Sequence, residues 1–259
     1  MIQNVLEGIK AYAQALPLIS KLKLWKYFVI PIIISIVTFV LTGTMVYYFA
    51  DDLGRYIAGF WRWEFGKQTF KAISTFLSGL LLLVLWIVFY KYIVLALSAP
   101  FMSPVSEKIE KHFKGQNNNF KISSFWQQLL RGLRINIRNL IKELLLTIPI
   151  LLLSIIPLIG FLSGFLLFIM QSYYAGFGNM DYTLERHYKY AESIDFVSKN
   201  KAIAVGNGMV FILLLLIPVL GVILVLPLSV TAATTVSIKR INIKYQYDYS
   251  KVEYKTAKE

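Results

Sequence analysis

One short apolar motif occurs twice in this chain and constrains its fold more than any other feature. The pattern I-P-[LV]-[IL]-G begins at residue 156 and again at residue 217, each time in the middle of a long apolar run. Proline removes a helix hydrogen-bond donor, and a glycine three residues later tolerates a change of backbone direction. Each run therefore predicts a helical hairpin, with Pro157 and Gly160 at the first turn and Pro218 and Gly221 at the second.

The lengths of these hairpins indicate how deeply they enter a membrane. The runs cover residues 144–177 and 202–238, so each arm of the first has about 15 residues, or roughly 22 Å of helix. A bilayer core is about 30 Å thick and takes about 20 residues to cross. The lengths favour re-entrant hairpins that turn back inside the bilayer. Short, tilted full spans in a locally thinned bilayer are the alternative.

Composition assigns the chain to the integral membrane proteins. Hydrophobic residues make up 57% and the mean hydropathy is +0.60. Net charge is +13, which we attribute to membrane topology and to anionic lipids or an anionic solute rather than to nucleic acid. Cysteine is absent, so disulfides and thiolate metal sites are excluded.

Two more segments are long and apolar enough to cross a bilayer. They are residues 28–50, which carry no charge, and residues 74–99. Residues 1–27 have helical spacing of apolar positions and predict an interfacial helix, with no signal peptide before the first span. Residues 239–259 form a polar tail. The fold class expected is an all-α integral membrane protein with two transmembrane helices, two re-entrant hairpins and interfacial amphipathic helices.

Charge counts predict the orientation of these spans. Four lysines and one glutamate precede the first span, four basic and three acidic residues lie between the spans, and eight basic and two acidic residues occupy positions 98–142. Positive charge favours the cytoplasmic side. We therefore expect a multi-pass protein of the inner (cytoplasmic) membrane with both termini in the cytoplasm.

Residues 100–142 predict cytoplasmic amphipathic helices. Pro100 is expected to end the second span, Ser103 to cap a short helix that follows, and Ser123 or Ser124 to cap another helix that runs to Lys142. One face of that helix carries a basic stripe, either a lipid-headgroup face or an anion path: Arg131, Arg134, Arg138 and Lys142.

Lys91 interrupts the second span. Its stem could lie along the helix while the amine reaches the nearby interface. The alternative is a cation that faces a pore, since charge inside a membrane marks a candidate site.

The chain resembles the CysZ family, which shares its domain with the etoposide-induced membrane proteins. The similar features are the segment L-W-K-Y-F-V-I-P at residues 24–31, Ala99-Pro100-Phe101 with Glu107 downstream, and Asp181-Tyr182 before a charged linker; they continue with Ile217-Pro218 followed by Pro227 and by A-A-T at residues 232–234. The resemblance implies two long transmembrane helices and two hemi-penetrating hairpins. It also implies an oligomer that passes sulfate into the cytoplasm for cysteine synthesis.

The resemblance also implies where an anion binds. In sulfate-transporting members an arginine pair after a glycine precedes the first span, whereas this chain has Lys26-Tyr27 there, preceded by Lys23 and no glycine. An anion path also needs cations and the backbone donors of helix N-termini. The candidate anion-binding residues are therefore the cationic Lys23, Lys26, Arg131, Arg134 and Arg138, and Ser98 and Ser103 at the expected helix break, which would present N-terminal donors. The candidates for a pore or gate are Lys91, Glu107, Asp181 and Arg186.

Motifs of other chemistries are missing from the sequence. It contains no G-x-S-x-G, P-loop or H-E-x-x-H pattern, and His112 and His187 are far apart. We therefore predict no enzyme, metal or cofactor. The expected function is a permease or channel for sulfate or a similar oxyanion, acting as a homo-oligomer. A non-transporting scaffold that shapes the bilayer is the alternative.

Overall fold

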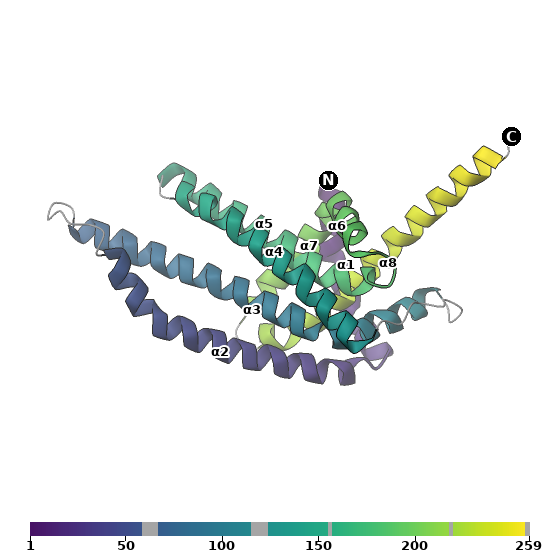
Figure 1. Cartoon of the computed structure of the whole chain (residues 1–259), viewed down its shortest axis with the longest axis horizontal. Coiled ribbons are helices and arrows are strands. Elements are labelled where there is room, and N and C mark those ends of the chain that lie inside the picture. The colour runs from purple at the N-terminus through teal and green to yellow at the C-terminus, as the bar shows by residue number, and fades with distance from the viewer. Residues whose placement is uncertain (59–66, 115–123, 155–156, 218–219, 257–259) are drawn as a thin grey trace.

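The computed structural model describes residues 1–58, 67–114, 124–154, 157–217 and 220–256, and within these ranges it is all-helical, without a strand. This confirms the all-helical part of the predicted fold class. In chain order the helices are α1 (Ile2–Lys21), α2 (Trp25–Ala58), α3 (Lys67–Lys114), α4 (Phe125–Leu153), α5 (Pro157–Leu184), α6 (Tyr190–Lys199), α7 (Lys201–Leu215) and α8 (Leu220–Thr256) (Figure 1).

Four of these helices contain apolar segments that are long enough to cross a membrane by length and composition. The segments are Trp25–Tyr48, Leu81–Lys114, Gly160–Leu184 and Ile223–Asn242. The first two belong to α2 and α3, which lie side by side as a long hairpin (Figure 1). Both expected spans are therefore helical. Much of the apolar surface of α2 is exposed, as suits a helix that faces lipid.

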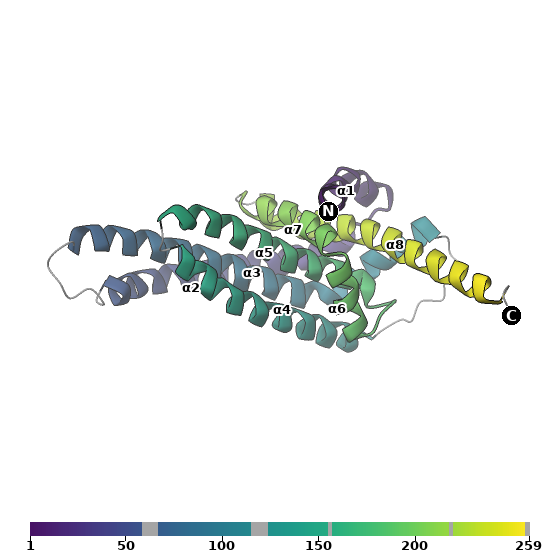
Figure 2. The same ribbon diagram turned by 90° about the horizontal axis from the view of Figure 1, so that it is seen from above.

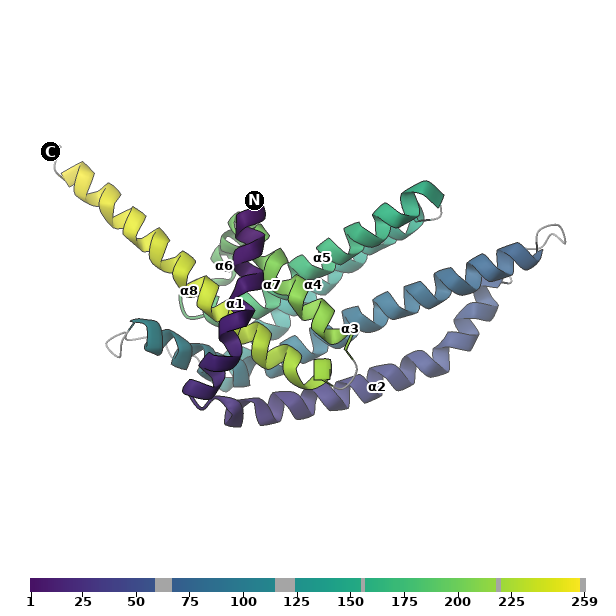
Figure 3. The same ribbon diagram turned by 180° about the vertical axis from the view of Figure 1, so that it is seen from behind.

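The predicted end of the second span at Pro100 is wrong. Helix α3 continues through Pro100 and Pro104 to Lys114, so Ser103 lies inside it and caps no helix. In Figures 1 and 3 the last part of α3 runs at a clear angle to the rest, as expected where prolines interrupt the hydrogen-bond ladder. Nearby side chains support the bend, since the Tyr182 hydroxyl donates to the Leu95 carbonyl (2.5 Å).

The basic helix after residue 123 is also longer than predicted. Ser124 caps α4 in a reciprocal box with Gln127, which confirms the predicted start. The helix does not end at Lys142 but runs to Leu153, so α4 and α5 form a hairpin with arms of 29 and 28 residues. The arms of about 15 residues that the sequence suggested for this hairpin are therefore wrong. How deep the two turns lie in a bilayer stays a prediction.

The glycines of the repeated motif lie just after the turns, in the first part of α5 and α8. A Cβ at Gly160 would lie 2.9 Å from the Ser154 carbonyl oxygen, and one at Gly221 would lie 2.0 Å from that of Leu214. Glycine is thus needed because each turn brings the end of one helix against the start of the next. Pro157 begins α5, a position that proline favours, whereas Pro218 lies outside the described residues.

Small residues let the two hairpins pack closely. A Cβ at Gly208 of α7 would lie 1.7 Å from the Ser172 carbonyl oxygen of α5, and one at Gly176 would lie 1.9 Å from that of Ala204. Figure 2 shows α4 on one side of α5, with α7, α8 and α1 on the other. Backbone-to-backbone contact of this kind is typical of helix packing in membranes.

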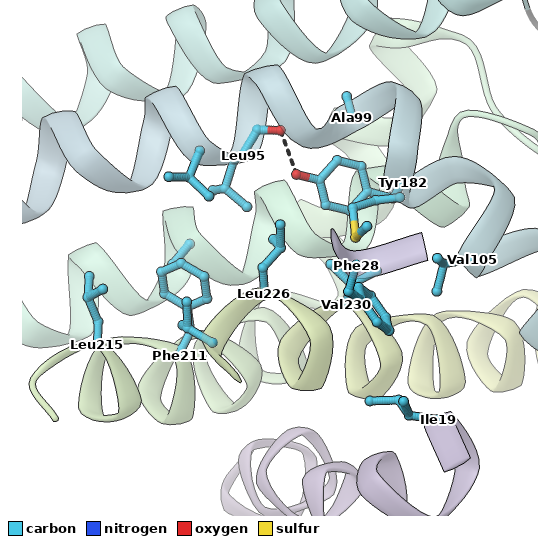
Figure 4. Packing of buried hydrophobic residues seen from close by; sticks show 14 of the residues in the cluster. Ile19, Phe28, Leu95, Ala99, Val105, Tyr182, Phe211, Leu215, Leu226 and Val230 are labelled. Carbon is cyan, nitrogen blue, oxygen red and sulfur yellow. Dashed lines mark hydrogen bonds between the residues drawn. The ribbon is translucent and has the colours of Figure 1, made fainter. Parts of the chain in front are cut away.

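A buried apolar cluster joins the hairpins to α2 and α3. Figure 4 shows Tyr182 of α5 reaching the Leu95 carbonyl in a cluster that includes Phe28, Leu226 and Val230. Helix α8 leaves this core and projects beyond it, so that most of the predicted polar tail is helical (Figure 3).

Candidate functional site

A basic pocket forms where α1 passes into α2. The junction is tight: Lys23 adopts φ 51°, a left-handed conformation that glycine takes up without strain. Three residues on, the Lys26 ammonium lies 5.3 Å from the centre of the Tyr27 ring, and the Lys108 ammonium lies 4.7 Å from the same ring. The end of α3 therefore adds positive charge to the lysines that precede the first span.

A cavity of about 570 Å³ opens at this place. It is lined by Leu22, Lys108, Lys111 and His112. Lys23 and Lys26 were predicted from the sequence as anion-binding residues, whereas the α3 residues of the cavity were not. More than 80 positions along the chain separate Lys26 from Lys108. Glu107, a gate candidate, pairs with Lys111 at 2.6 Å and so partly balances the charge of the pocket.

A second cluster ties α4 to α5 and α6. The Arg131 guanidinium donates to both oxygens of Asp181 (3.0 and 3.2 Å), to the Tyr188 carbonyl (2.8 Å) and to the Ser193 hydroxyl (2.6 Å). The structure thus brings two candidate residues, Arg131 and Asp181, together in one ion pair. With its donors used in this way, Arg131 serves mainly to hold the helices.

The basic stripe on α4 is therefore divided. Arg134 is exposed and stacks over the Tyr190 ring at 4.0 Å, whereas the half-buried Arg138 donates to Asn139 (2.8 Å) and lies 5.5 Å from the Phe177 ring. The stripe is not a single anion path. Of its four residues, Arg134 and Lys142 are exposed and Arg131 and Arg138 are half-buried.

A third cluster lies around the bend of α3. The Arg186 guanidinium donates to Glu110 (3.2 Å), to the Ser106 hydroxyl (2.6 Å) and to the Ser103 carbonyl (3.2 Å). His187 contacts the other oxygen of Glu110 at 2.7 Å. Ser103 therefore contributes its backbone carbonyl to a structural arginine, and its place inside α3 removes the helix N-terminal donors that were expected of it.

Glu185 lies between these two clusters, just beyond the apolar segment Gly160–Leu184. Burial raises the pKa of its carboxyl group to about 7; Asp181 acts in the same direction, and the Ser103 hydroxyl opposes it. One of its carboxylate oxygens is buried without a hydrogen-bond partner. Glu185 thus takes up a proton close to neutral pH, a property that its position in the sequence did not predict.

Lys91 is fully buried, which contradicts the interpretation that its amine reaches the interface. Its ammonium donates to both carboxylate oxygens of Glu143 on α4 (2.6 and 2.7 Å) and to the Gln171 carbonyl on α5 (3.3 Å). The Tyr92 hydroxyl donates to Glu143 as well (2.7 Å). Burying one ion costs several kcal/mol, so the two charges are mutually required at this depth.

Glu143 belongs to a row of polar residues on the buried face of α4. Asn139 and Asn136 precede it by about one and two helical turns and are 0% and 3% exposed, whereas Ile137 on the outer face is 51% exposed. The Asn136 carbonyl oxygen, the Asn139 amide nitrogen and the Ser98 hydroxyl of α3 are buried without hydrogen-bond partners. We give the name polar seam to this row of Asn136, Asn139 and Glu143, together with Lys91 of α3, which pairs with Glu143, and Ser98, about two helical turns further along α3.

Comparison with known proteins adds one finding. A family model described as "Sulfate transporter CysZ/Etoposide-induced protein 2.4" matches residues 11–226, which is most of the chain and includes the basic pocket and the polar seam. No curated protein matches.

Proposed function

Because the chain belongs to the family of sulfate transporter CysZ and etoposide-induced protein 2.4, we propose that it is a membrane permease or channel for sulfate or a similar oxyanion. It is a multi-pass membrane protein of a transporter-type family, and the finer assignment rests on its basic pocket. That assignment includes a role in supplying sulfur assimilation.

The observation that carries the proposal is the convergence of Lys26 and Lys108 on the Tyr27 ring, beside a cavity lined by Lys111 and His112. Several cations around a water-filled hollow raise the local concentration of a divalent anion. Lysines supply charge without fixing a geometry, unlike the planar fork of arginine. We therefore infer a gathering site at one mouth of the route, with modest selectivity among oxyanions.

Labelled-sulfate flux into proteoliposomes, compared with phosphate and chloride, tests this function. Lys26→Ala and Lys108→Ala should each lower sulfate uptake sharply, because each removes a cation that lies over the Tyr27 ring beside the cavity. Lys199→Ala is the control, since Lys199 is an exposed lysine on α6 that neither lies over Tyr27 nor lines the cavity. Uptake no higher than in empty liposomes, from correctly folded protein, would argue for a bilayer-shaping scaffold instead.

A scaffold would respond differently to the same variants. Its attraction to anionic lipid amounts to about 1 kcal/mol per basic residue near the surface, whichever residue supplies the charge. Lys199→Ala should then weaken binding to anionic vesicles as much as Lys26→Ala does. In a permease the two variants differ in uptake.

We further propose that the protein lies in the inner membrane with both termini in the cytoplasm, in contact with anionic lipids, and that it forms homo-oligomers. The charge counts support the orientation, and the many exposed apolar side chains of α2 and α4 supply surface for lipid or for a second copy. Accessibility of single cysteines near each terminus, in a chain that has none, tests the orientation. Light scattering of the detergent-purified protein tests the oligomer.

A further inference from the structure

The polar seam holds an arrangement that the proposed function does not yet use. Lys91 and Tyr92 point their donors at one carboxylate, with the Lys91 ammonium 2.6 and 2.7 Å from the two oxygens of Glu143 and the Tyr92 hydroxyl 2.7 Å from one of them. Lys91 and Glu143 are 0% exposed and Tyr92 is 3% exposed. A cation and a hydroxyl donor directed at two oxygens match what any small oxyanion requires in an apolar environment.

We propose that Lys91 and Tyr92 form an internal oxyanion site, which Glu143 occupies in this conformation as a tethered anion that keeps the route closed. This inference rests on the proposed function, because it names a second site on the path of the same anions. The carboxylate of Glu143 stands where an oxyanion would stand, and a free anion binds only when that carboxylate is displaced or absent.

The neighbouring residues favour a route over a simple lock between helices. An ion pair that only joins α3 to α4 has no need of unpaired polar groups beside it. The Asn136 and Asn139 side chains each keep a buried polar atom without a partner, as does Ser98. Each such atom costs about 1–3 kcal/mol in apolar surroundings. The two asparagines follow one another along α4 between Arg131 and Glu143. They mark a path on which a hydrated solute would supply the missing hydrogen bonds.

Space beside the seam supports the same inference. A cavity of about 190 Å³ lies between α3 and α4, and both Tyr92 and Asn136 line it. Its walls are otherwise apolar side chains such as Leu97 and Leu133, which can move without breaking hydrogen bonds. The cavity therefore leaves room beside Tyr92 and Asn136.

Replacing the tethered anion tests the proposal. Glu143→Gln keeps the shape of the side chain and removes its charge, which leaves Lys91 and Tyr92 to receive an anion. In proteoliposomes, labelled-sulfate and nitrate flux should rise roughly tenfold or more over wild type, because repulsion from one buried like charge at low dielectric exceeds the 1.4 kcal/mol that corresponds to a factor of ten. Lys91→Gln/Glu143→Gln, which lacks the cation too, should stay at or below wild type.

Controls separate this site from general effects of charge. Asp195→Asn also neutralises one acidic residue, on the exposed surface of α6, and should leave flux unchanged. A folded Glu143→Gln protein with wild-type flux would overturn the proposal, and so would an equal rise in the double variant. Should Glu143→Gln not fold, Glu143→Asp retains the charge but draws it back from Lys91. Its flux should rise by a smaller factor, and unchanged flux in folded protein would again contradict the site.

The outcome also separates this inference from the proposed function. Sulfate flux in wild type with no change in Glu143→Gln removes the internal site and leaves the permease assignment in place. Flux in Glu143→Gln but none in wild type supports the internal site without the permease. Absence of flux in both overturns both.

Discussion

The ammonium of Lys91 lies 2.6 and 2.7 Å from the two carboxylate oxygens of Glu143, and the structure buries both side chains completely inside the apolar segment of α3 and the facing surface of α4. This pair joins two helices that are 52 positions apart at the contacting residues. It therefore has consequences for stability that can be measured apart from any transport.

Removing one partner of this pair should destabilise the fold strongly. Lys91→Met leaves the Glu143 carboxylate buried without its cation, which typically costs about 3–5 kcal/mol. Lys91→Met/Glu143→Leu replaces both charges with apolar groups and should recover most of that loss. Thermal unfolding of the detergent-purified variants measures both effects. A double variant no more stable than Lys91→Met would contradict the ion-pair explanation.

Glycine at position 208 should be irreplaceable, whereas glycine at position 164 should not. A Cβ at Gly208 would lie 1.7 Å from the Ser172 carbonyl oxygen, so Gly208→Ala must push α5 and α7 apart, at a cost of about 3 kcal/mol or more. Nothing lies within 4 Å of a Cβ at Gly164, so Gly164→Ala should gain up to about 1 kcal/mol from helix propensity. Melting temperatures that shift equally in both variants would refute the close packing of α5 and α7.

Arg131 and Arg134 of the predicted basic stripe should differ in their importance for stability. Arg131→Gln removes donors to Asp181, Tyr188 and Ser193 and leaves the Asp181 carboxylate without its partner, so a loss of roughly 3 kcal/mol is expected. Arg134→Gln removes only a stacked, exposed cation and should cost less than about 1 kcal/mol. Denaturation of the two variants side by side checks this. Similar losses would show that Arg131 has no special structural role.

Glu185 should make stability depend on pH near neutrality. In the folded protein the pKa of its carboxyl group is raised from 4.5 to about 7, so the folded state holds the proton more tightly than the unfolded state does. Stability should therefore fall as pH rises from about 4.5 to about 7, by at most about 3 kcal/mol, and stay level above that range. Glu185→Gln should abolish this decline. Melting curves recorded from pH 5 to pH 8 for both proteins would reveal it, and parallel curves would contradict it.

Replacement of two nearby lysines by glycine, just before α2 and at its start, should change stability in opposite directions. Lys23 has φ 51°, so Lys23→Gly should stabilise the fold by about 1 kcal/mol because glycine adopts this conformation without strain. Lys26 is the second residue of α2, where Lys26→Gly should cost up to about 1 kcal/mol. Calorimetry of the two variants would show the difference in sign. Destabilisation by Lys23→Gly would mean that its side chain, and not its backbone, governs the turn.

The turn before α2 differs in sequence from the family pattern. The sequence lacks the glycine that the resemblance led us to expect before the first span, and Lys23 adopts a left-handed backbone conformation there. The departure in sequence thus leaves a left-handed residue just before α2. It changes the chemistry of the site, since two lysines and Lys108 stand where an arginine pair was expected.

Helices α3 and α4 show where predictions from neighbouring residues alone were wrong. Pro100 is a strong stop signal in water, yet buried neighbours on α5 hold α3 together beyond it. On α4 the polar Asn139 and Glu143 are buried while Ile137 is exposed, the reverse of the pattern expected of a helix at the surface of a soluble protein. A lipid environment accepts the exposed apolar face, and the neighbouring helices satisfy the polar one.

The sequence by itself determined the all-helical membrane class and the two long apolar spans, and it predicted hairpin turns close to glycines that the structure places at the start of α5 and α8. These depend on the length of apolar runs and on proline and glycine, and such local properties act wherever the chain is placed. Tertiary structure alone decided the partners of the charged residues. Lys91 pairs with Glu143, Arg131 pairs with Asp181, and Lys108 lies over the ring of Tyr27. The physical reason is that a side chain's partner depends on which helix faces pack together, and backbone contacts such as that of Gly208 with Ser172 set this packing across long stretches of chain.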